Sequence, residues 1–431
     1  MGAAGKSRVH EAQSRVVLAE YGSVEAALSP DVFDLLRTRY SKQIEVAHTG
    51  REGVYRLTAR DYVGRVSLPG GSLLVIRPKV GVANLFYMLC ADAGVADFHP
   101  PPTGLQKDPD IFPFVLLALL RSIENLLGAG LYRDYERRED VLPYVRGRIL
   151  LQEQARRGWP EHVQTCAYAD LSIDTPENRV LAATLRLVPL LMVGQEEKAA
   201  ARKARALLRW FAGVRVVGRG EALALAARLN IHRLNAAYKP ALALCALALR
   251  GLTLNEQEGK HQYASFLVDM PRLFESFLTQ RLSRLMPEWR LRVVAQKHDY
   301  LDEERRVGIR PDVLVYQGRG GEPLLVLDAK YRRPGVGEGR SSLNSDLYQV
   351  SAYLDRYGLS EGVLVYPRFG EDEGTRLNLR GTPKHLHLLT LDLGAATPAL
   401  LDEECRRLTE VVAGLSQERG GAGRLTPGPS L

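Results

Sequence analysis

The residues best suited to chemistry lie between Ile309 and Tyr331. An apolar strand that carries Asp312 is predicted to turn in a glycine-rich stretch and to return as a second apolar strand, which ends in Asp328 and Lys330. Because side chains alternate along a strand, the last two side chains point to one face. The neighbouring strand of the hairpin can bring Asp312 to the same face. The sequence therefore predicts two carboxylates and one ammonium group side by side on an apolar hairpin.

This set of charges predicts a bound cation. Burying each ion costs roughly several kcal/mol unless a partner neutralises it, and two carboxylates beside one lysine leave excess negative charge. Oxygen ligands favour Mg²⁺, with Mn²⁺ as a substitute, and the segment lacks the His and Cys residues of a zinc site. Lys330 would orient or deprotonate a water molecule, or neutralise charge on a phosphorane. Phosphodiester hydrolysis is the favoured chemistry, and a structural salt-bridge cluster is the alternative.

The elements around the hairpin predict a C-terminal α/β domain over residues 256–415. The pattern indicates a helix at 266–285, strands at 290–295, 307–316 and 324–329, a helix at 344–357, strands at 362–365 and 385–393, and a helix at 399–415. Residues 416–431 are rich in Gly and lack periodicity, which predicts a flexible tail.

Two further units are predicted ahead of this domain. Residues 1–105 contain short alternating runs, with a hairpin turn at 68–71 and a helix start at Ser29-Pro30-Asp31, which predicts a β-rich unit. Residues 106–255 carry Leu and Ala at helical spacing and predict a helical block. The expected fold is α+β and multidomain: a β-rich N-terminal unit, an α-helical middle and a C-terminal α/β domain. Residues 266–393 are expected to fold without residues 1–105.

Composition limits the class of protein. The chain has 431 residues, 45% of them hydrophobic, and a net charge of +8, which fits a globular protein of two or three domains with a mild preference for polyanions. The four cysteines lie far apart, so neither a zinc site nor a disulfide framework is favoured. We expect a cytoplasmic protein with no membrane partner, since the sequence has neither a signal peptide nor a membrane-spanning run. It also lacks a Walker-type phosphate loop.

The hairpin motif resembles the signature of the PD-(D/E)xK nucleases. Pro311-Asp312 is followed, after a spacer of fifteen residues, by Asp328-Ala329-Lys330. The resemblance implies a restriction-endonuclease-like fold for residues 256–415. In that superfamily a helical Glu upstream often supplies a further metal ligand, and a Gln or Tyr on the following helix contacts the site or the substrate. The implied catalytic residues are Asp312, Asp328, Lys330 and Glu275, the metal ligands are Asp312, Asp328 and Glu275, and the substrate-binding residues are Gln349 and Tyr353.

The wider chain resembles the McrC family, the nuclease subunits of McrBC-type modification-dependent restriction systems. The segments that carry the resemblance are residues 74–80, 84–89, 146–149, 174–181, 270–277 and 346–349, together with the hairpin motif. The resemblance implies a Mg²⁺-dependent DNA endonuclease subunit whose partners are DNA and an AAA+ GTPase of the McrB type, which binds the GTP. It also implies that the N-terminal half docks on this GTPase and stimulates its hydrolysis.

Two other functions remain open at this point. One is a stand-alone nuclease of the same fold that acts in repair or recombination. The other is a non-catalytic nucleic-acid-binding scaffold. Asn178, Arg179, Arg146 and Arg148 also lie in the resembling segments. Helix capping and salt bridging explain them at least as well as function does, so they stay outside the catalytic set.

Overall fold

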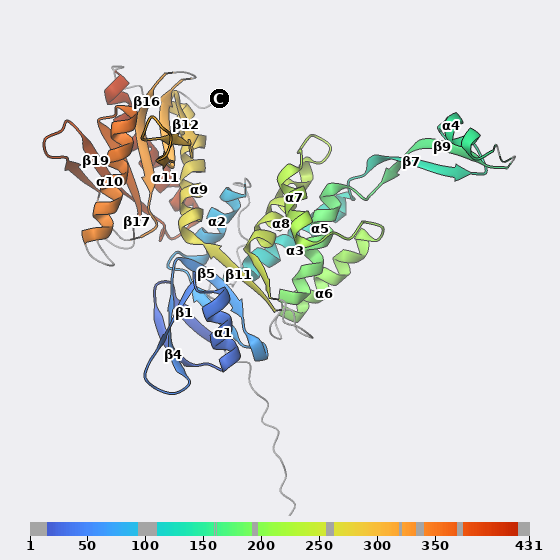
Figure 1. The fold of residues 1–431 in the computed structure, drawn as a ribbon, viewed down its shortest axis with the longest axis horizontal. Coiled ribbons are helices and arrows are strands. Elements are labelled where there is room, and N and C mark those ends of the chain that lie inside the picture. Colours follow the sequence, from blue (N-terminus) through green and yellow to red (C-terminus); the bar gives the residue numbers. More distant parts are fainter. Residues whose placement is uncertain are drawn as a thin grey trace, which may run out of the picture. The chain divides into compact units, whose positions relative to one another are not determined.

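The structure is a computed structural model of the chain. It describes residues 15–93, 110–158, 160, 162–191, 197–255, 263–318, 321–332, 340–368 and 374–420. The chain divides into two compact units, and Figure 1 labels the elements of both. The first unit combines Met1–Phe114 with Phe266–Leu431, and the second unit is Val115–Ser265.

The first unit joins the two ends of the chain, which differs from the separate ranges that the sequence predicted. The side chain of Asn84 is buried and donates hydrogen bonds to the carbonyl oxygens of Leu393, at 3.0 Å, and Ala395, at 2.7 Å. The Tyr87 hydroxyl donates to Oδ1 of Asp402 at 3.0 Å. These hydrogen bonds connect residues 84–87 with residues 393–402 inside the first unit. That the C-terminal part closes a core of its own stays a prediction.

The C-terminal part of the first unit is built on a sheet, which within the described residues has six strands in the order β12-β15-β16-β17-β19-β18. The strands are β12 (Leu291–Ala295), β15 (Val313–Gln317), β16 (Pro323–Ala329), β17 (Glu361–Arg368), β18 (Thr375–Asn378) and β19 (His385–Asp392). The predicted hairpin is confirmed as the antiparallel pair β15–β16, and β16 pairs with β17 in parallel. The strand expected at 307–316 is interrupted: β14 (Gly308–Ile309) pairs with β13 (Asp299–Tyr300) before β15 begins.

Helices cover this sheet (Figure 1). They are α9 (Met270–Leu285), α10 (Arg340–Tyr357) and α11 (Pro398–Gly420). Helix α10 connects the parallel strands β16 and β17 and packs on both, while α11 packs on β16 and β19. Gly362 allows the close approach of α10, because a Cβ atom at this position would lie 2.8 Å from Cγ1 of Val350. Val326 and Leu364 belong to the apolar core between α10 and the sheet.

The N-terminal part of the first unit is β-rich, as predicted. Strands β1 (Arg15–Ala19), β6 (Leu73–Arg77), β5 (Tyr62–Ser67) and β11 (Tyr263–Asp269) lie side by side in that order, and β2 (Ser23–Ala27), β4 (Val54–Ala59) and β3 (Ile44–His48) form a second sheet. The helices are α1 (Pro30–Arg39) and α2 (Val82–Asp92). Gly64 has a φ of +125°, and a Cβ atom there would collide with the carbonyl oxygen of Phe266, so β5 can pair with β11 only with a glycine at this position.

The second unit is mainly helical. Its helices are α3 (Phe112–Ala129, which begins in the first unit), α4 (Leu151–Arg156), α5 (Pro176–Leu187), α6 (Glu197–Leu208), α7 (Arg219–Arg228) and α8 (Lys239–Gly251), and β10 (Leu252–Asn255) follows α8. By length and composition alone, helix α3 is long and apolar enough to cross a membrane, and 56% of that stretch is buried within the structure. Short 3₁₀ turns occur in this unit at Val188–Leu191, Arg209–Phe211 and Ala236–Tyr238, and in the first unit at Pro69–Gly71 and Met286–Trp289.

The four cysteines of the chain, two in each unit, are buried free thiols.

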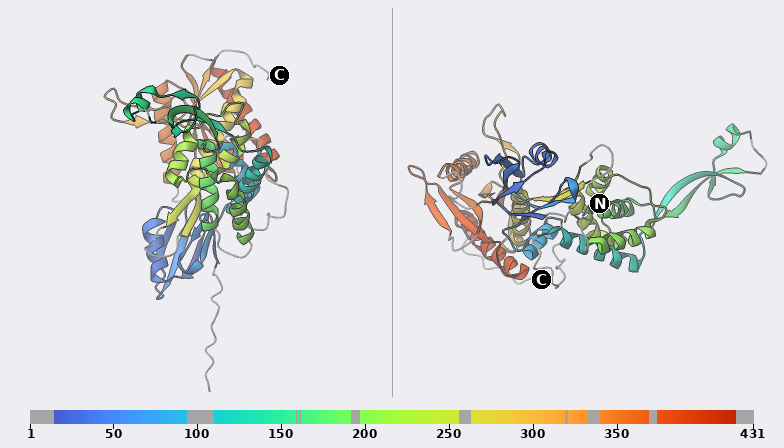
Figure 2. Two further views of the ribbon diagram at one scale, coloured as in Figure 1. Left: turned by 90° about the vertical axis from the view of Figure 1, so that its right-hand side faces the viewer. Right: turned by 90° about the horizontal axis from the view of Figure 1, so that it is seen from below.

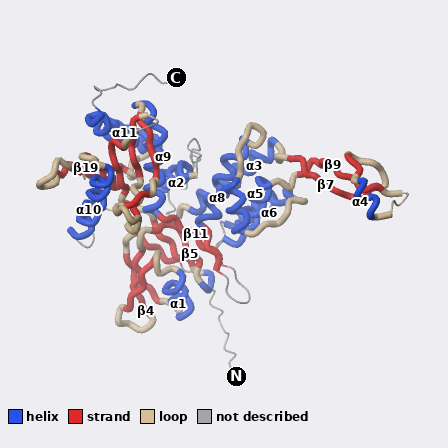
Figure 3. Tube along the Cα trace, turned by 45° about the horizontal axis from the view of Figure 1, so that its top comes forward, coloured by secondary structure: helices blue, strands red, loops and turns tan. Residues whose placement is uncertain are grey.

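A β-ribbon extends from the helices of the second unit, and the helical prediction for residues 106–255 missed it. It consists of β7 (Asp134–Leu142), β8 (Arg148–Ile149) and β9 (Gln164–Ser172), with α4 near its tip (Figures 1, 2 and 3). We call residues 134–172 the arm. All residues of β7 except the last are exposed, so the strand lacks the alternation of polar and apolar residues that reveals a half-buried strand.

Candidate active site

The β15–β16 hairpin brings the two predicted aspartates together. Val313 pairs with Leu327, so the next position along the ladder places Asp312 across from Asp328. The backbone N–H of Ala329 donates a hydrogen bond to Oδ2 of Asp312 at 2.8 Å. The side chain of Asp328 is only 2% exposed. The carboxylates therefore lie at the end of the apolar hairpin, where the alternation of side chains predicted them.

Lys330 and the predicted residues of the following helix form a chain of contacts. The Lys330 Nζ lies 2.6 Å from Oδ2 of Asp328 and donates to Oε1 of Gln349 at 2.9 Å. Gln349 Nε2 in turn donates to the hydroxyl of Tyr353 at 2.7 Å, and Tyr353 is 3% exposed. The helix α10 thus holds the ammonium group from one side through Gln349. Tyr353 supports Gln349 from within the core.

Gln296 is a part of the site that sequence reasoning missed. It follows β12, has a φ of 51° and donates its backbone N–H to the carbonyl of Asp312 at 3.0 Å. Its side-chain amide donates to Oε1 of Glu275 and, at 3.1 Å, to Oδ1 of Asp312. Gln296 thereby links the carboxylate of α9 to that of the hairpin. Nothing in the spacing of a single glutamine indicates this, because the contact depends on how β12 pairs with β15.

The electrostatics of the site follow from burial and crowding. Burial raises the pKa of Asp312, the Ala329 N–H lowers it and the charge of Glu275 raises it, and together these effects bring the pKa to about 6. Burial and then the charge of Asp312 raise the pKa of Asp328 to about 6. Burial, followed by the charge of Asp328, also raises the pKa of Glu275. At neutral pH the site therefore holds more negative charge than the Lys330 ammonium balances.

This donor set fits a divalent cation at the two aspartates. Oδ2 of Asp328 is buried and has the Lys330 ammonium 2.6 Å away, and this one positive charge does not balance the two aspartates. Among the described residues, no three His, Cys, Asp or Glu side chains converge closely enough to hold a metal ion. Glu275 accepts a hydrogen bond from the Gln296 amide, which also donates to Asp312, so Gln296 connects Glu275 to the two aspartates. Asp312 and Asp328 are thus the two carboxylates that the hairpin brings together, while Glu275 contacts them through Gln296.

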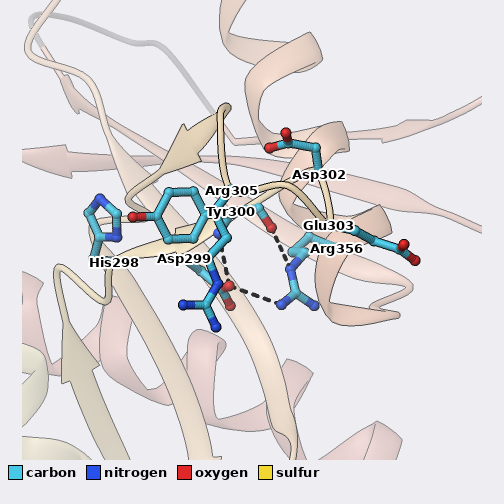
Figure 4. A pocket seen from close by; sticks show the side chains of 7 residues that line it. All are labelled: His298, Asp299, Tyr300, Asp302, Glu303, Arg305 and Arg356. Carbon is cyan, nitrogen blue, oxygen red and sulfur yellow. Dashed lines mark hydrogen bonds and ion pairs between the residues drawn. The ribbon is translucent and has the colours of Figure 1, made fainter.

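A cleft of about 400 Å³ lies beside the β13–β14 hairpin. It is lined by residues between His298 and Arg305 together with Arg356 of α10 (Figure 4). Arg356 forms one wall by donating to Oδ1 of Asp299 at 2.9 Å and to the carbonyl of Tyr300 at 2.7 Å. Neither Asp312 nor Asp328 lines this cleft. Arg356 and Asp299 form an ion pair in its wall, and the cleft stays outside the candidate site.

The Asp174–Leu181 motif has a structural role at the base of the arm. Asn178 is fully buried, and its amide donates to the carbonyls of Tyr132, at 2.9 Å, and Ile173, at 2.7 Å, which precede β7 and follow β9. It also accepts a hydrogen bond from the Tyr238 hydroxyl at 2.9 Å. One side chain therefore fixes both ends of the arm.

The neighbouring polar residues of the resembling segments also make local contacts. Thr175 caps α5 by accepting from the Asn178 N–H, and Arg179 pairs with Asp174 at 2.8 Å. Arg146 pairs with Asp170 at 2.8 Å on the exposed arm. The structural interpretation of Asn178 and Arg179, capping and salt bridging, is the one that these contacts support.

Comparison with known proteins places the chain in a family of restriction-system proteins. Residues 57–367, which include the hairpin motif, match the McrBC 5-methylcytosine restriction system component family, and the chain belongs to this family. It is 24% identical over 359 residues to the type IV methyl-directed restriction enzyme EcoKMcrBC of Escherichia coli K12, a match that covers 76% of this chain and 97% of that protein.

A solved structure has the same fold. It is the refined half-complex from the tetradecameric assembly of Thermococcus gammatolerans McrB AAA+ hexamers with bound McrC. The match has a TM-score of 0.62 at 18% identity and covers 93% of this chain and 100% of that chain. The resemblance to McrC that the sequence motifs suggested is thereby confirmed.

Proposed function

We propose that this chain is the Mg²⁺-dependent DNA endonuclease subunit of a McrBC-type restriction system. The observation that carries the proposal is the convergence of Asp312, Asp328 and Lys330 at the end of one hairpin, with both aspartate pKa values raised to about 6. The order α9, β15–β16, α10, β17 around this motif is the order expected for a PD-(D/E)xK nuclease domain. Family membership over residues 57–367 favours a subunit of a restriction system over a stand-alone repair nuclease.

Each residue of the site has a distinct proposed role. Asp312 and Asp328 would hold the Mg²⁺, which supplies positive charge to the scissile phosphate and lowers the pKa of a bound water. Lys330 faces the same carboxylates and presents its ammonium group to the charge that develops on the phosphate oxygens. Gln349 keeps this ammonium in place because its Oε1 accepts a hydrogen bond from Lys330 Nζ at 2.9 Å. Tyr353 is buried, so its contribution is to orient Gln349.

The direct test is a cleavage assay with the full-length protein. Supercoiled plasmid, methylated and unmethylated, is incubated with Mg²⁺ in the presence and absence of a McrB-type GTPase and GTP. Asp328→Ala is expected to abolish cleavage while circular dichroism shows an intact fold, because it removes a metal ligand and relieves carboxylate repulsion. Asp31→Ala, an exposed substitution in the first turn of α1, is the control and should cleave as the wild type does. Wild-type cleavage by the Asp328 variant would refute the site.

The same assay separates the subunit from a stand-alone nuclease. We propose that an AAA+ GTPase related to the McrB in the Thermococcus gammatolerans complex selects the target, and that this chain stimulates its hydrolysis. Cleavage should therefore require the GTPase and GTP. Cleavage that is equally fast without them would favour the stand-alone nuclease.

The surface that docks the GTPase was predicted to lie in residues 1–105. Two observations now favour the arm instead. Residues 15–93 belong to the unit that carries the candidate active site. The arm exposes several large apolar side chains: Tyr135 at 73%, Tyr144 and Val145 at 59% each, and Leu151 at 60%. Exposed groups of apolar residues often mark a surface that binds another protein. We therefore propose that the arm makes the apolar contact with the GTPase.

A further inference from the structure

Lys330 lies one residue beyond the end of β16, where the sheet no longer fixes the backbone on both sides. Its N–H still donates to the carbonyl of Val365 on β17 at 2.9 Å. The lysine stem has four rotatable carbons, so the position of Nζ depends on how the next residues are held. A displacement of about 1 Å at such a group can cost on the order of a hundredfold in rate. The contacts that hold the residue after Lys330 therefore affect where Nζ lies in the site.

Two residues at the end of β1 hold Tyr331, the residue after Lys330. The Tyr21 hydroxyl donates to the Tyr331 carbonyl at 3.1 Å, and the Tyr331 hydroxyl donates to Oε2 of Glu20 at 3.4 Å. Glu20 is 1% exposed and Tyr331 is 5% exposed, so the contact between these two residues is shielded from water, whereas the ring of Tyr21 lies at the edge of the cluster and is 39% exposed. Both contacts join residues more than three hundred positions apart in the chain.

The two holding residues are themselves fixed by the N-terminal sheets. Oε2 of Glu20 also accepts the backbone N–H of Lys79 at 3.1 Å. The Lys79 ammonium lies 4.3 Å from the centre of the Tyr21 ring, which holds the ring by a cation–π contact. Burial, and after it the nearby carboxylate of Asp61, raise the pKa of the Tyr21 hydroxyl, which therefore keeps its proton. Tyr21 and Glu20 thus belong to a polar cluster that is also held by Lys79 of the N-terminal part.

The same N-terminal strands hold the helix that carries Glu275. The carbonyl of Asp61 accepts the N–H of Met270 at 3.0 Å, and the Tyr62 hydroxyl donates to Oδ2 of Asp269, the residue that caps α9, at 3.0 Å. On α9, the ring of Phe274 lies 5.8 Å from the ring of Tyr331. Tyr331 is therefore enclosed between the N-terminal strands and α9.

From this geometry we propose that Glu20 and Tyr21 are positioning residues for Lys330. Through them, the N-terminal sheet helps to set the geometry of the nuclease site. The proposal rests on the nuclease function proposed above. Tyr21 fixes the carbonyl of Tyr331, Glu20 fixes its side chain, and Val365 fixes the amide of Lys330, so the backbone around the lysine is held at both ends. Nζ then lies where it contacts Asp328 and Gln349.

The test uses Tyr21→Phe in the full-length chain, which removes the hydroxyl and keeps the ring over which the Lys79 ammonium lies. Tyr55→Phe, on β4 of the same N-terminal part, is the matched control. Two quantities are measured: kcat and KM for plasmid cleavage with Mg²⁺, the GTPase and GTP, and the rate at which acetic anhydride acetylates Lys330 without DNA or partner. Acetylation of Lys384, which pairs with Asp355 in the same unit, is the internal reference.

The expected result for Tyr21→Phe is a fall in kcat of roughly tenfold with KM little changed, and an acetylation rate of Lys330 that rises several-fold relative to Lys384. Glu20→Gln keeps an acceptor for the Lys79 N–H and the Tyr331 hydroxyl and should retain wild-type kcat, whereas Glu20→Ala should not.

The proposal is overturned if Tyr21→Phe leaves both kcat and Lys330 acetylation unchanged. It is also overturned if Lys330 and Lys384 become reactive together, because the contact would then support the whole unit rather than the lysine. If the wild-type protein does not cleave DNA, the proposed function fails by itself. The acetylation rates then still decide whether Tyr21 positions Lys330.

Discussion

Asp312 accepts the backbone N–H of Ala329 across the hairpin, with a distance of 2.8 Å between the nitrogen and Oδ2. The bond ties the carboxylate of one strand to the peptide between the two polar residues of the next strand. It also lowers the pKa of Asp312 against the larger effect of burial, which raises it. The two strands therefore present their polar groups in a fixed relation before any cation or substrate arrives.

The raised pKa of Asp328 predicts a pH-dependent effect of Asp328→Asn on stability without divalent cations. Its folded pKa of about 6 lies above the ordinary value of 3.8, so the stability that proton binding contributes is present below pH 3.8 and is lost as the pH rises through about 6. The variant should therefore be more stable than the wild type at pH 8, by on the order of 1–3 kcal/mol, and should lose this advantage at pH 4. Thermal unfolding in EDTA measures it.

Asp302 provides a control, because its pKa is shifted in the opposite direction from that of Asp328. Backbone hydrogen bonds from Val307 and Arg306 lower the pKa of Asp302, so its contribution is present above pH 3.8 and lost as the pH falls. Asp302→Asn should therefore be less stable than the wild type at pH 8. If the Asp328 and Asp302 variants respond to pH alike, burial of Asp328 is not the cause.

Lys330→Met is expected to separate cleavage from metal binding. The substitution keeps the length of the side chain and removes the ammonium that lies 2.6 Å from Asp328. Cleavage should fall by roughly a hundredfold or more, because the charge acts on the reacting phosphate. Mn²⁺ binding, followed by titration calorimetry, should be kept, since the two aspartates remain. Lys384→Met is the control, and loss of Mn²⁺ binding in the Lys330 variant would make the lysine structural.

Asn178→Ala should destabilise the second unit. It leaves the carbonyls of Tyr132 and Ile173 and the hydroxyl of Tyr238 without their buried partner. A loss of about 2–4 kcal/mol in the free energy of unfolding is expected from urea titration. Asn378→Ala, an exposed change on β18, should shift it by less than about 0.5 kcal/mol. Equal effects of the two substitutions would remove Asn178 from its role at the base of the arm.

Val145→Asp on the arm is expected to weaken docking of the GTPase by at least about tenfold, because it places a charge in a proposed apolar contact. The affinity and the stimulated rate of GTP hydrolysis are measured with the purified pair. Val411→Asp makes the same change at an exposed valine of α11, where we expect no effect. Unchanged docking by the Val145 variant would return the docking surface to residues 1–105.

Deletion of residues 15–93 should prevent the nuclease part from folding, because it removes the hydrogen bonds of Asn84 and Tyr87 to the C-terminal region and exposes the core beneath them. Circular dichroism and thermal unfolding are the measurements. Replacing residues 134–172 with a short Gly-Ser linker is the control, and it should keep the unfolding transition of the first unit. A cooperative transition in the first deletion would show that the C-terminal part is an independent domain after all.

The sequence alone determined the hairpin and its charges. A strand alternates its side chains and a hairpin pairs neighbouring residues, so the spacing of Asp312, Asp328 and Lys330 was enough to bring them together. The same local rules predicted the helix that carries Gln349, the helix that carries Glu275 and the β-rich character of the first residues.

Tertiary structure decided what depends on contacts between distant segments. Gln296 joins the site because β12 pairs with β15, and Tyr21 reaches Tyr331 across about three quarters of the chain. The sequence did not predict the arm, because β7 has no buried face and its residues therefore do not alternate between polar and apolar types. The contacts of Gln296 and Tyr21 join residues that are far apart in the chain, and β7 packs against no core. A periodic sequence pattern shows only which residues within one helix or strand are buried, so it predicts neither case.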